Sequence, residues 1–475
     1  MLTKISYNNF DIYTEELIHP EDFLKLYRKE RIIVSFETKV NNVGKKAFST
    51  FLAKERHSTN IKEGDYVVFR FIKDNKKFEF LSRINKWGKF HIPKIAIETL
   101  SINNHEQIYF EVVGEKDKSN EKESNSLDLS NSGRKTGVIF RENNFITLIE
   151  KGKIPITLPR FIEITPDLIE LCFLIHGDGH YNTKLFFVNK DTELIRFVIN
   201  KFEEIFRIPK DTWRARLLFN NSASPDVAKK RWKKNLNLRE EQFYPSISKC
   251  TLNTSELGNL RIVIDKLIVA HVFRSTFDTI KQNIKGANAL YALNGLLCAE
   301  GNAEKTKGRG LHKITINYSA KEKNMFKEIL AEANIINLIK DRKDRFVIEG
   351  WVNCYQFFKI FFSNRIIPFD LHMGRCNNAL SGFLEHSFTK TMEKYLTILD
   401  RKEQMNTNEI MEETNHLGNS VRKLLRKKQY TRFVNSIGRG INRNPIIFSI
   451  TPEGKEFLTL TKDIREVYNE KNGLG

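Results

Sequence analysis

Two apolar stretches in the middle of the chain end in the same way. Residues 171–179 read LCFLIHGDG and residues 293–301 read LNGLLCAEG, so each closes with a small residue, an acid and a glycine. Apolar runs of this kind predict buried helices. The first helix is predicted to begin at Thr165, a favourable N-cap, with Pro166 at its first position.

The segments after these two helices also correspond. Extended or alternating residues predict strands at 185–188 and 312–318, and an amphipathic helix follows each strand. Further strands are predicted at 260–267 and 345–352. The centre of the chain is therefore predicted to be a tandem duplication of helix, strands, helix, strands. The apolar stripes of its amphipathic helices are Leu194, Ile195, Val198, Ile199, Phe202 and Phe206, and then Met325, Phe326, Ile329, Leu330 and Ala333.

The segment before the duplication, residues 1–114, is predicted to be β-rich with an internal repeat. Two Gly-Lys segments, 44–48 and 88–94, each lead to an apolar strand. Residues 115–136 are rich in Ser, Asn, Lys and Glu. They predict a linker, because they cannot bury enough apolar surface to fold.

The last segment, residues 387–475, is predicted to contain three helices, a β-hairpin and a final helix capped by Thr451. Between 416 and 452 it contains no acidic residue, which is unusual for a merely solvated surface and suits a nucleic-acid contact. The cations in this window are Arg422, Lys423, Arg426, Lys427, Lys428, Arg432, Arg439 and Arg443.

Overall charge supports the same class of partner. The 475 residues include 78 Lys and Arg against 58 Asp and Glu, a net charge of +20, which favours nucleic acid. The 40% hydrophobic content is ordinary for globular proteins. The sequence shows no signal peptide and no membrane span, and its five scattered cysteines suggest a reducing, cytoplasmic setting.

The acids Asp178 and Glu300 are the candidate catalytic residues. An acid at a helix C-terminus opposes the helix dipole, and here this occurs twice at matching places. The alternative is that each Asp-Gly or Glu-Gly pair is only a helix cap with a left-handed glycine. If the helices pack through their small residues, the carboxylates converge and require cations, for which Mg²⁺ (or Mn²⁺) is suited.

These motifs resemble those of the LAGLIDADG homing endonucleases, in the single-chain form with two repeats. The resemblance implies an α+β fold in which tandem αββαββα repeats form a curved antiparallel sheet platform that binds double-stranded DNA. The core would span 137–386, with repeat one at about 155–282 and repeat two at about 283–386. By this resemblance Asp178 and Glu300 bind metal and direct cleavage, and Gly177 and Ala299 are metal ligands with them.

The resemblance also implies DNA contacts on the strands and near the metals. Lys313, Thr315 and Asn317 share one strand face, and Lys184 occupies the corresponding place in repeat one. Lys305 and Lys307 are candidates for a basic residue beside the metals, or else loop surface charges. In the C-terminal segment the candidates are Arg422, Lys423, Arg426, Lys427 and Lys428.

Some features depart from the family pattern. Phe173 stands where a small interface residue is usual, which predicts a less close or different helix crossing. His176 replaces a polar or acidic residue and is expected to be either a packed interface residue or a functional one. The basic insertion at 229–234 is either a DNA clamp or a solvated loop anchored by Trp232.

The flanking segments have resemblances of their own. Residues 84–113, with Gly88 followed by Ile92-Pro93-Lys94, resemble the AbrB family, which implies that a tandem copy within 1–114 forms a swapped-hairpin barrel. The alternative is a small β-domain whose basic residues are solvated surface. Residues 387–475 resemble a winged helix-turn-helix, with a closing Thr-Pro-Glu-Gly-Lys stretch.

Together these features predict a metal-dependent, site-specific DNA endonuclease, monomeric with internal pseudo-twofold symmetry. A DNA-binding transcriptional regulator that uses the same core without cleavage is the alternative, and an RNA-splicing maturase stays open as a third.

Overall fold

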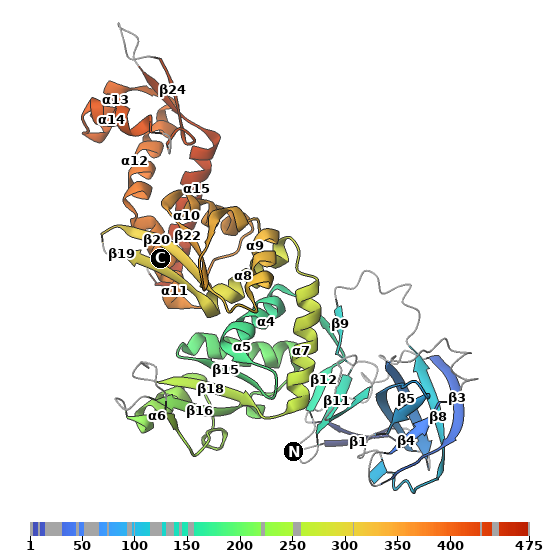
Figure 1. Cartoon of the computed structure of the whole chain (residues 1–475). Coiled ribbons are helices and arrows are strands. Elements are labelled where there is room, and N and C mark those ends of the chain that lie inside the picture. Colours follow the sequence, from blue (N-terminus) through green and yellow to red (C-terminus); the bar gives the residue numbers. More distant parts are fainter. Residues whose placement is uncertain are drawn as a thin grey trace. The chain divides into compact units, whose positions relative to one another are not determined.

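The computed structural model describes residues 3–7, 10–14, 31–43, 47–51, 66–73, 76–92, 97–98, 100–114, 126–129, 137–141, 145–150, 156–219, 224–249, 258–306, 308–427, 430–438 and 446–473. These residues form a mixed α+β protein with several small sheets (Figure 1). The chain divides into two compact units. One comprises Met1–Leu168, Gly179–Lys190 and Val198–Gln282, and the other Ile169–Asp178, Asp191–Phe197 and Asn283–Gly475.

The first copy of the duplication begins at the predicted helix cap, where Thr165 Oγ1 accepts a hydrogen bond from the Leu168 amide at 3.2 Å. Its sheet has the order β14-β15-β18-β16-β17. Its elements are α4 (Pro166–Asp178), β14 (Gly179–His180), β15 (Leu185–Asn189), α5 (Thr192–Phe206), β16 (Arg214–Phe219), α6 (Pro225–Leu236), β17 (Ser248–Lys249), β18 (Asn259–Ile264) and α7 (Leu267–Gln282).

The second copy repeats this order without the insertion that carries α6 and β17. Its sheet has the order β19-β20-β22-β21. Counting the four shared strands in chain order, both sheets run 1-2-4-3 with antiparallel neighbours. The predicted duplication is therefore present in the strand topology. The elements are α8 (Ala287–Glu300), β19 (Gly301–Thr306), β20 (Gly310–Asn317), α9 (Lys323–Glu332), β21 (Ile339–Asp341), β22 (Arg345–Glu349) and α10 (Trp351–Ser363).

The last strand of each copy is shorter than predicted. β18 ends at Ile264 and β22 ends at Glu349, so the apolar residues that follow belong to helices α7 and α10. In the second copy Gly350 has a φ of +85°, which a glycine adopts easily and which turns the chain from strand into helix. An apolar run does not by itself show where a strand ends and the following helix begins.

The N-terminal segment shows the predicted internal repeat in its strand pairing. Its strands are β3 (Arg31–Lys39), β4 (Phe48–Thr50), β5 (Tyr66–Lys73), β6 (Lys76–Arg83), β7 (Lys89–His91) and β8 (Gln107–Gly114). The first strand of each half pairs with the last strand of the other half, β3 with β8 and β6 with β5. Phe36, Phe69, Phe90 and Phe110 fill the core between them.

The predicted barrel is not observed in this segment. Within the described residues the strands form a four-stranded sheet, β3-β8-β5-β6, and a separate pair, β4 with β7. Short strands β1 (Thr3–Tyr7) and β2 (Phe10–Thr14) pair with each other. The described structure of this segment therefore consists of separate antiparallel sheets, with no ring closure between them.

Part of the predicted linker is ordered. Residues 115–125 and 130–136 lie outside the described structure, but β9 (Ser126–Asp128) pairs with β13 (Phe161–Glu163). The guanidinium of Arg160 holds the Asp128 carboxylate at 3.0–3.3 Å. This charge-assisted pair is a contact that composition could not reveal. Strands β10 (Gly137–Arg141), β11 (Phe145–Glu150) and β12 (Ile156–Pro159) form a further small sheet.

The C-terminal segment has the predicted helix order and one strand that was not predicted. Helices α12 (Ser387–Lys402), α13 (Thr407–Thr414) and α14 (Gly418–Leu425) precede strands β24 (Val434–Ile437) and β25 (Ile447–Ile450) and helix α15 (Pro452–Lys471). The additional strand, β23 (Gln404–Asn406), pairs with β25 to make a sheet of order β23-β25-β24. Thr451 caps α15, accepting a hydrogen bond from the Gly454 amide at 3.0 Å.

This segment packs directly on the second copy, within one compact unit. Trp351 on α10 contacts the rings of Phe388, Phe433 and Phe457, with centroids 4.0–5.9 Å apart. Its indole nitrogen donates to Thr389 Oγ1 at 2.7 Å. Buried aromatic clusters of this size contribute strongly to stability. Helix α11 (Met373–Glu385) also contacts α15.

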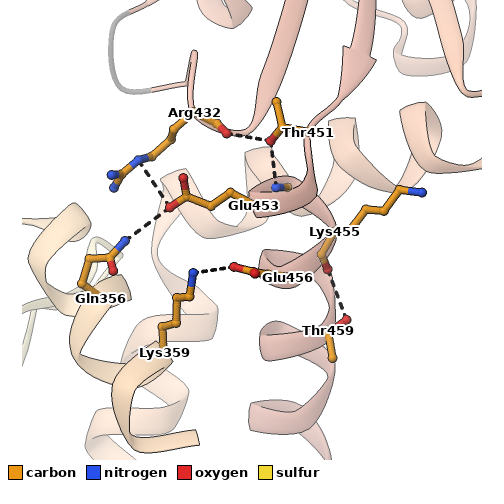
Figure 2. Close-up of polar contacts among 9 residues, drawn as sticks. Gln356, Lys359, Arg432, Thr451, Glu453, Lys455, Glu456 and Thr459 are labelled. Carbon is orange, nitrogen blue, oxygen red and sulfur yellow. Dashed lines mark hydrogen bonds and ion pairs between the residues drawn. The ribbon is translucent and has the colours of Figure 1, made fainter. Parts of the chain in front are cut away.

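Polar contacts at the start of α15 complete this interface (Figure 2). Glu453 accepts a hydrogen bond from Gln356 Nε2 at 3.3 Å and lies 3.5 Å from Arg432 Nε, and Lys359 pairs with Glu456. Partly exposed pairs of this kind contribute less than about 1 kcal/mol each. The aromatic cluster therefore carries most of the attachment, and the ion pairs fix its register.

None of the described helices is long and apolar enough to cross a membrane.

Candidate active site and nucleic-acid surfaces

The two motif helices are in direct contact through small residues. A Cβ atom added to Gly295 of α8 would lie 2.6 Å from the Glu170 carbonyl oxygen and 3.1 Å from the Leu174 amide nitrogen of α4. A Cβ added to Gly177 would overlap the Cβ of Ala299 and lie 3.3 Å from Glu300 Cγ. The helices therefore approach backbone to backbone, which glycine permits.

The bulky Phe173 does not prevent this approach. It is fully buried, and its Cβ would be 3.1 Å from a Cβ on Gly295. The large residue on one helix faces a glycine on the other, and the absent side chain of that glycine leaves room for the close approach. The less close crossing predicted from Phe173 is thus not observed.

Both helices run straight into strands, so the simple helix-cap explanation of the acids does not hold. Gly179 and Gly301 have φ values of −122° and −80°, outside the left-handed region that a capping glycine adopts. Gly301 is required for space instead, because a Cβ there would lie 2.5 Å from the Leu297 carbonyl oxygen. Asp178 and Glu300 are the last residues of helices α4 and α8, and both are half-buried.

Glu300 has an electrostatic environment of mixed sign. Burial raises its pKa, the nearby Glu322 carboxylate raises the pKa further, and Arg375 and His176 lower it. His176 Nε2 lies 3.1 Å from Glu322 Oε1, and this contact lowers the pKa of Glu322 to about 2. His176 is therefore not simply a packed interface residue, because it pairs with an acid beside the candidate site.

Arg375 holds the C-terminal end of α8. Its Nη1 donates to the carbonyl oxygens of Ala299 at 2.7 Å, Leu297 at 3.4 Å and Cys298. A cation at this end of a helix also complements the helix dipole. Arg375 could not be predicted from sequence, because it lies 75 residues after Glu300 and outside every motif.

We expect Arg375→Met to lower the free energy of unfolding by about 2 kcal/mol, because charge-assisted hydrogen bonds to carbonyls of buried residues are lost. Denaturant unfolding measures this change. Arg401→Met, on the exposed end of α12, is the matched control and should shift stability by less than about 1 kcal/mol. Equal losses in the two variants would show that Arg375 does not hold α8.

A buried polar network that sequence analysis missed also joins the motif helices. Asn294 Nδ2 donates to Glu170 Oε1 at 3.0 Å, and Asn294 Oδ1 accepts from the Phe369 amide at 2.8 Å. Asn294 is 1% exposed and Glu170 is 8% exposed. Buried polar groups that are paired in this way specify one register for the packed helices.

The groups at the two helix ends fit a divalent cation in part. Carboxylates and backbone carbonyls are the oxygen ligands that Mg²⁺ takes, usually with retained waters. Asp178 and Glu300 supply the carboxylates, but the Ala299 carbonyl already accepts a hydrogen bond from Arg375 and has one lone pair left. In the described part of the chain, no cluster of three or more His, Cys, Asp or Glu side chains forms a ready-made metal site.

The sheet of the first copy carries arginines that sequence analysis did not single out. Arg216 on β16 lies directly opposite Arg261 on β18. The guanidinium groups lie 4.4 Å from the Tyr244 ring centroid and 4.7 Å from the Phe186 ring centroid, respectively. Their Nε atoms have no hydrogen-bond partner among the described residues. Like charges directly opposite each other destabilise a sheet, so this face has the character of an anion-binding surface.

The DNA-contact candidates of the core have different environments. Asn317 is exposed, but Thr315 is only 2% exposed and so does not present its hydroxyl to a ligand. Lys313 pairs with Glu304 at 2.9 Å, Lys184 with Asp265 at 2.7 Å, and Lys305 with Glu385 at 2.7 Å. Lys307 lies outside the described residues. The strand alternation predicted correctly which residues share a face, but not what covers that face.

The C-terminal candidates lie at the end of α14. Lys423, Arg426 and Lys427 are exposed, whereas Arg422 is half-buried and donates to Asn419 Oδ1 at 3.2 Å. Lys428 lies outside the described residues. The three exposed members of this set are all cations within one short segment.

Comparisons with known proteins add little to these observations. No protein-family model matches the chain, and no curated protein matches it. The solution structure of PHS018 from Pyrococcus horikoshii is similar to part of the chain, with 24% identity over 19% of this chain and 99% of that chain and a TM-score of 0.16. A similarity this weak supports no conclusion about fold or function.

Proposed function

We propose that this protein is a divalent-metal-dependent DNA endonuclease of the LAGLIDADG type, with Asp178 and Glu300 as its catalytic acids. The observation that supports this most directly is the contact between the motif helices at Gly177 and Ala299, immediately before the two acids. The two copies of the duplication support the same assignment, because their sheets have the same strand order and each sheet follows one of these helices.

Each group in the candidate active site has a role in the proposal. Asp178 and Glu300 would hold Mg²⁺ (or Mn²⁺) with the carbonyls of Gly177 and Ala299. When bound, such a cation lowers the pKa of a water and stabilises developing charge on phosphate oxygens. Arg375 would fix the position of Glu300 by holding the last turn of α8, and the close helix packing would exclude water from the space behind the acids.

Duplex DNA is the proposed substrate because of the cationic surfaces. Arg216 and Arg261 have planar guanidinium groups of the kind that read guanine edges in the major groove. Asn317 and the exposed cations Lys423, Arg426 and Lys427 extend the set of candidate contacts in the other unit. Half to two-thirds of protein–DNA hydrogen bonds go to phosphate and sugar, which these lysines suit.

The second candidate is a DNA-binding regulator without cleavage. It is favoured by the C-terminal segment, whose helices and three-stranded sheet have the order expected for a winged helix-turn-helix. It gives no reason for two half-buried acids to stand at the ends of packed helices, where a carboxylate repels phosphate and opposes the helix dipole.

One experiment separates the two functions. The protein is incubated with Mg²⁺ and a plasmid library that carries random inserts, and cut ends are sequenced. The endonuclease should produce breaks at one family of sites, which disappear when EDTA replaces Mg²⁺. Tight DNA binding without breaks, with Mg²⁺ or with Mn²⁺, would establish the regulator instead.

A further inference from the structure

Helix α6, Pro225–Leu236, gives the basic insertion of the first copy a defined form. The insertion was expected to be either a DNA clamp or a solvated loop anchored by Trp232, and it is a helix anchored on one side, where Ala228, Trp232 and Leu236 are buried. The spacing of four residues puts these three on one face. The cations of the insertion must therefore lie on the flanks and on the opposite face.

Four of the five cations of α6 fall into two pairs, and the fifth, Arg231, belongs to neither. Lys229 pairs with Glu240, and Lys233 lies 3.3 Å from the same carboxylate. Lys230 and Lys234 are exposed one turn apart, and neither forms an ion pair with an acid among the described residues. The ion pairs with Glu240 account for Lys229 and Lys233. They do not account for Lys230 and Lys234.

Lys230 and Lys234 destabilise the helix that carries them. Like charges at i and i+4 cost a helix about 0.2–0.5 kcal/mol. A cation in the last turn complements the helix dipole, which accounts for Lys234, but Lys230 lies at the centre of the helix where this effect is small. The helix that carries them is anchored by Trp232, which is fully buried. Two lysines whose positive charges are not neutralised, on an anchored helix, are suited to binding an external polyanion.

The surface around α6 continues onto the sheet through one short helical turn. Gln242, in the turn Glu240–Gln242, donates to the Lys210 and Trp213 carbonyls at 3.0 Å. Its own carbonyl accepts from Arg214 Nε at 3.3 Å. Tyr244, two residues after Gln242, lies under the guanidinium groups of Arg214 and Arg216, 4.8 and 4.4 Å from its ring centroid. Thus α6 and the arginines belong to one connected framework.

We propose that α6 is a phosphate-binding anchor for duplex DNA, in which Lys230 and Lys234 contact the sugar–phosphate backbone beside the site engaged by Arg216 and Arg261. This inference rests on the proposed DNA binding but not on cleavage. Contacts of this type add affinity without sequence preference, and they make affinity depend on salt.

The test compares Lys230→Gln/Lys234→Gln with Lys390→Gln/Lys462→Gln, which removes two exposed lysines from α12 and α15. Affinity for a random-sequence duplex is measured by fluorescence anisotropy over a range of salt concentrations, and circular dichroism confirms that both variants fold. The α6 variant should lower the slope of log K against log salt by about 1.8, since each phosphate contact contributes about 0.9. The control should change it by much less.

The outcomes are distinct. If the wild-type protein binds no DNA, both the proposed function and this inference fail. If it binds and the two variants have the same salt dependence, only the role of α6 fails. The same assay is run with a double-stranded RNA, and an affinity loss of the α6 variant for RNA with DNA affinity unchanged would overturn the choice of DNA as the partner.

Discussion

Asp178→Asn and Glu300→Gln are each expected to reduce double-strand cleavage on the order of 1,000-fold, while duplex affinity stays equal or rises. The amide side chains keep the size and the hydrogen-bonding capacity of the acids but lose the charge that a divalent cation requires. Removing one group that stabilises transition-state charge typically has an effect of about this size on rate. Affinity is retained because a carboxylate beside phosphate contributes repulsion.

Cleavage is measured on a supercoiled plasmid that carries the selected site, and binding is measured on a short duplex with the same site. Glu332→Gln, an exposed acid on α9, is the matched control and should cut like the wild type. Full cleavage by either active-site variant would remove that acid from the catalytic assignment. Loss of binding in parallel with cleavage would indicate a structural role instead.

Gly295→Val is expected to destabilise the protein by about 3 kcal/mol and to abolish cleavage. A Cβ at this position would lie 2.6 Å from the Glu170 carbonyl oxygen, which is backbone and cannot rotate away. Overpacking in a rigid interior typically costs about 1–3 kcal/mol, and valine adds a branched side chain to the helix. Separation of α4 from α8 would also move the two acids apart. Guanidinium chloride unfolding and the plasmid assay measure the two effects.

Gly374→Ala is the matched control, because Gly374 also lies in a helix but has space around it. A Cβ there would have its nearest neighbour, His372 Cε1, at 3.7 Å, an ordinary contact. This substitution should be neutral or should stabilise the protein by about 0.5–1 kcal/mol through helix propensity. Similar destabilisation of both variants would show that close packing at Gly295 is not special.

The duplicated core was predictable because its signals are local and repeated. The N-cap at Thr165, the two apolar runs and the apolar stripes each depend on residues within a few turns of one another, and each matches an observed element. The paired acids were found for the same reason, since the two copies give the same ending twice.

The remaining features depend on contacts between distant residues. Arg375 reaches the Ala299 carbonyl at the end of α8 across 76 positions, and Asn294 reaches Glu170 across 124. Thr315 stands at a polar position of an alternating strand, which predicts a surface residue, yet the fold buries it. Arg216 and Arg261 become neighbours only through strand pairing. Short strand β23 has no pattern of its own and is defined by its pairing with β25.

The packing of α15 on α10 and α11 would fix the distance between two proposed DNA contacts. The exposed cations after α14 and the sheet β19–β22 belong to one compact unit, joined by the ring cluster around Trp351. If a flexible linker joined the two contacts, both could still be made when their spacing on DNA changed. A shared core holds the contacts at one spacing. Adding about 5 base pairs between the two contacted segments would rotate one of them by half a helical turn, so only one could then be held. The unit would therefore accept only one spacing and one rotational setting between its two contacts on DNA.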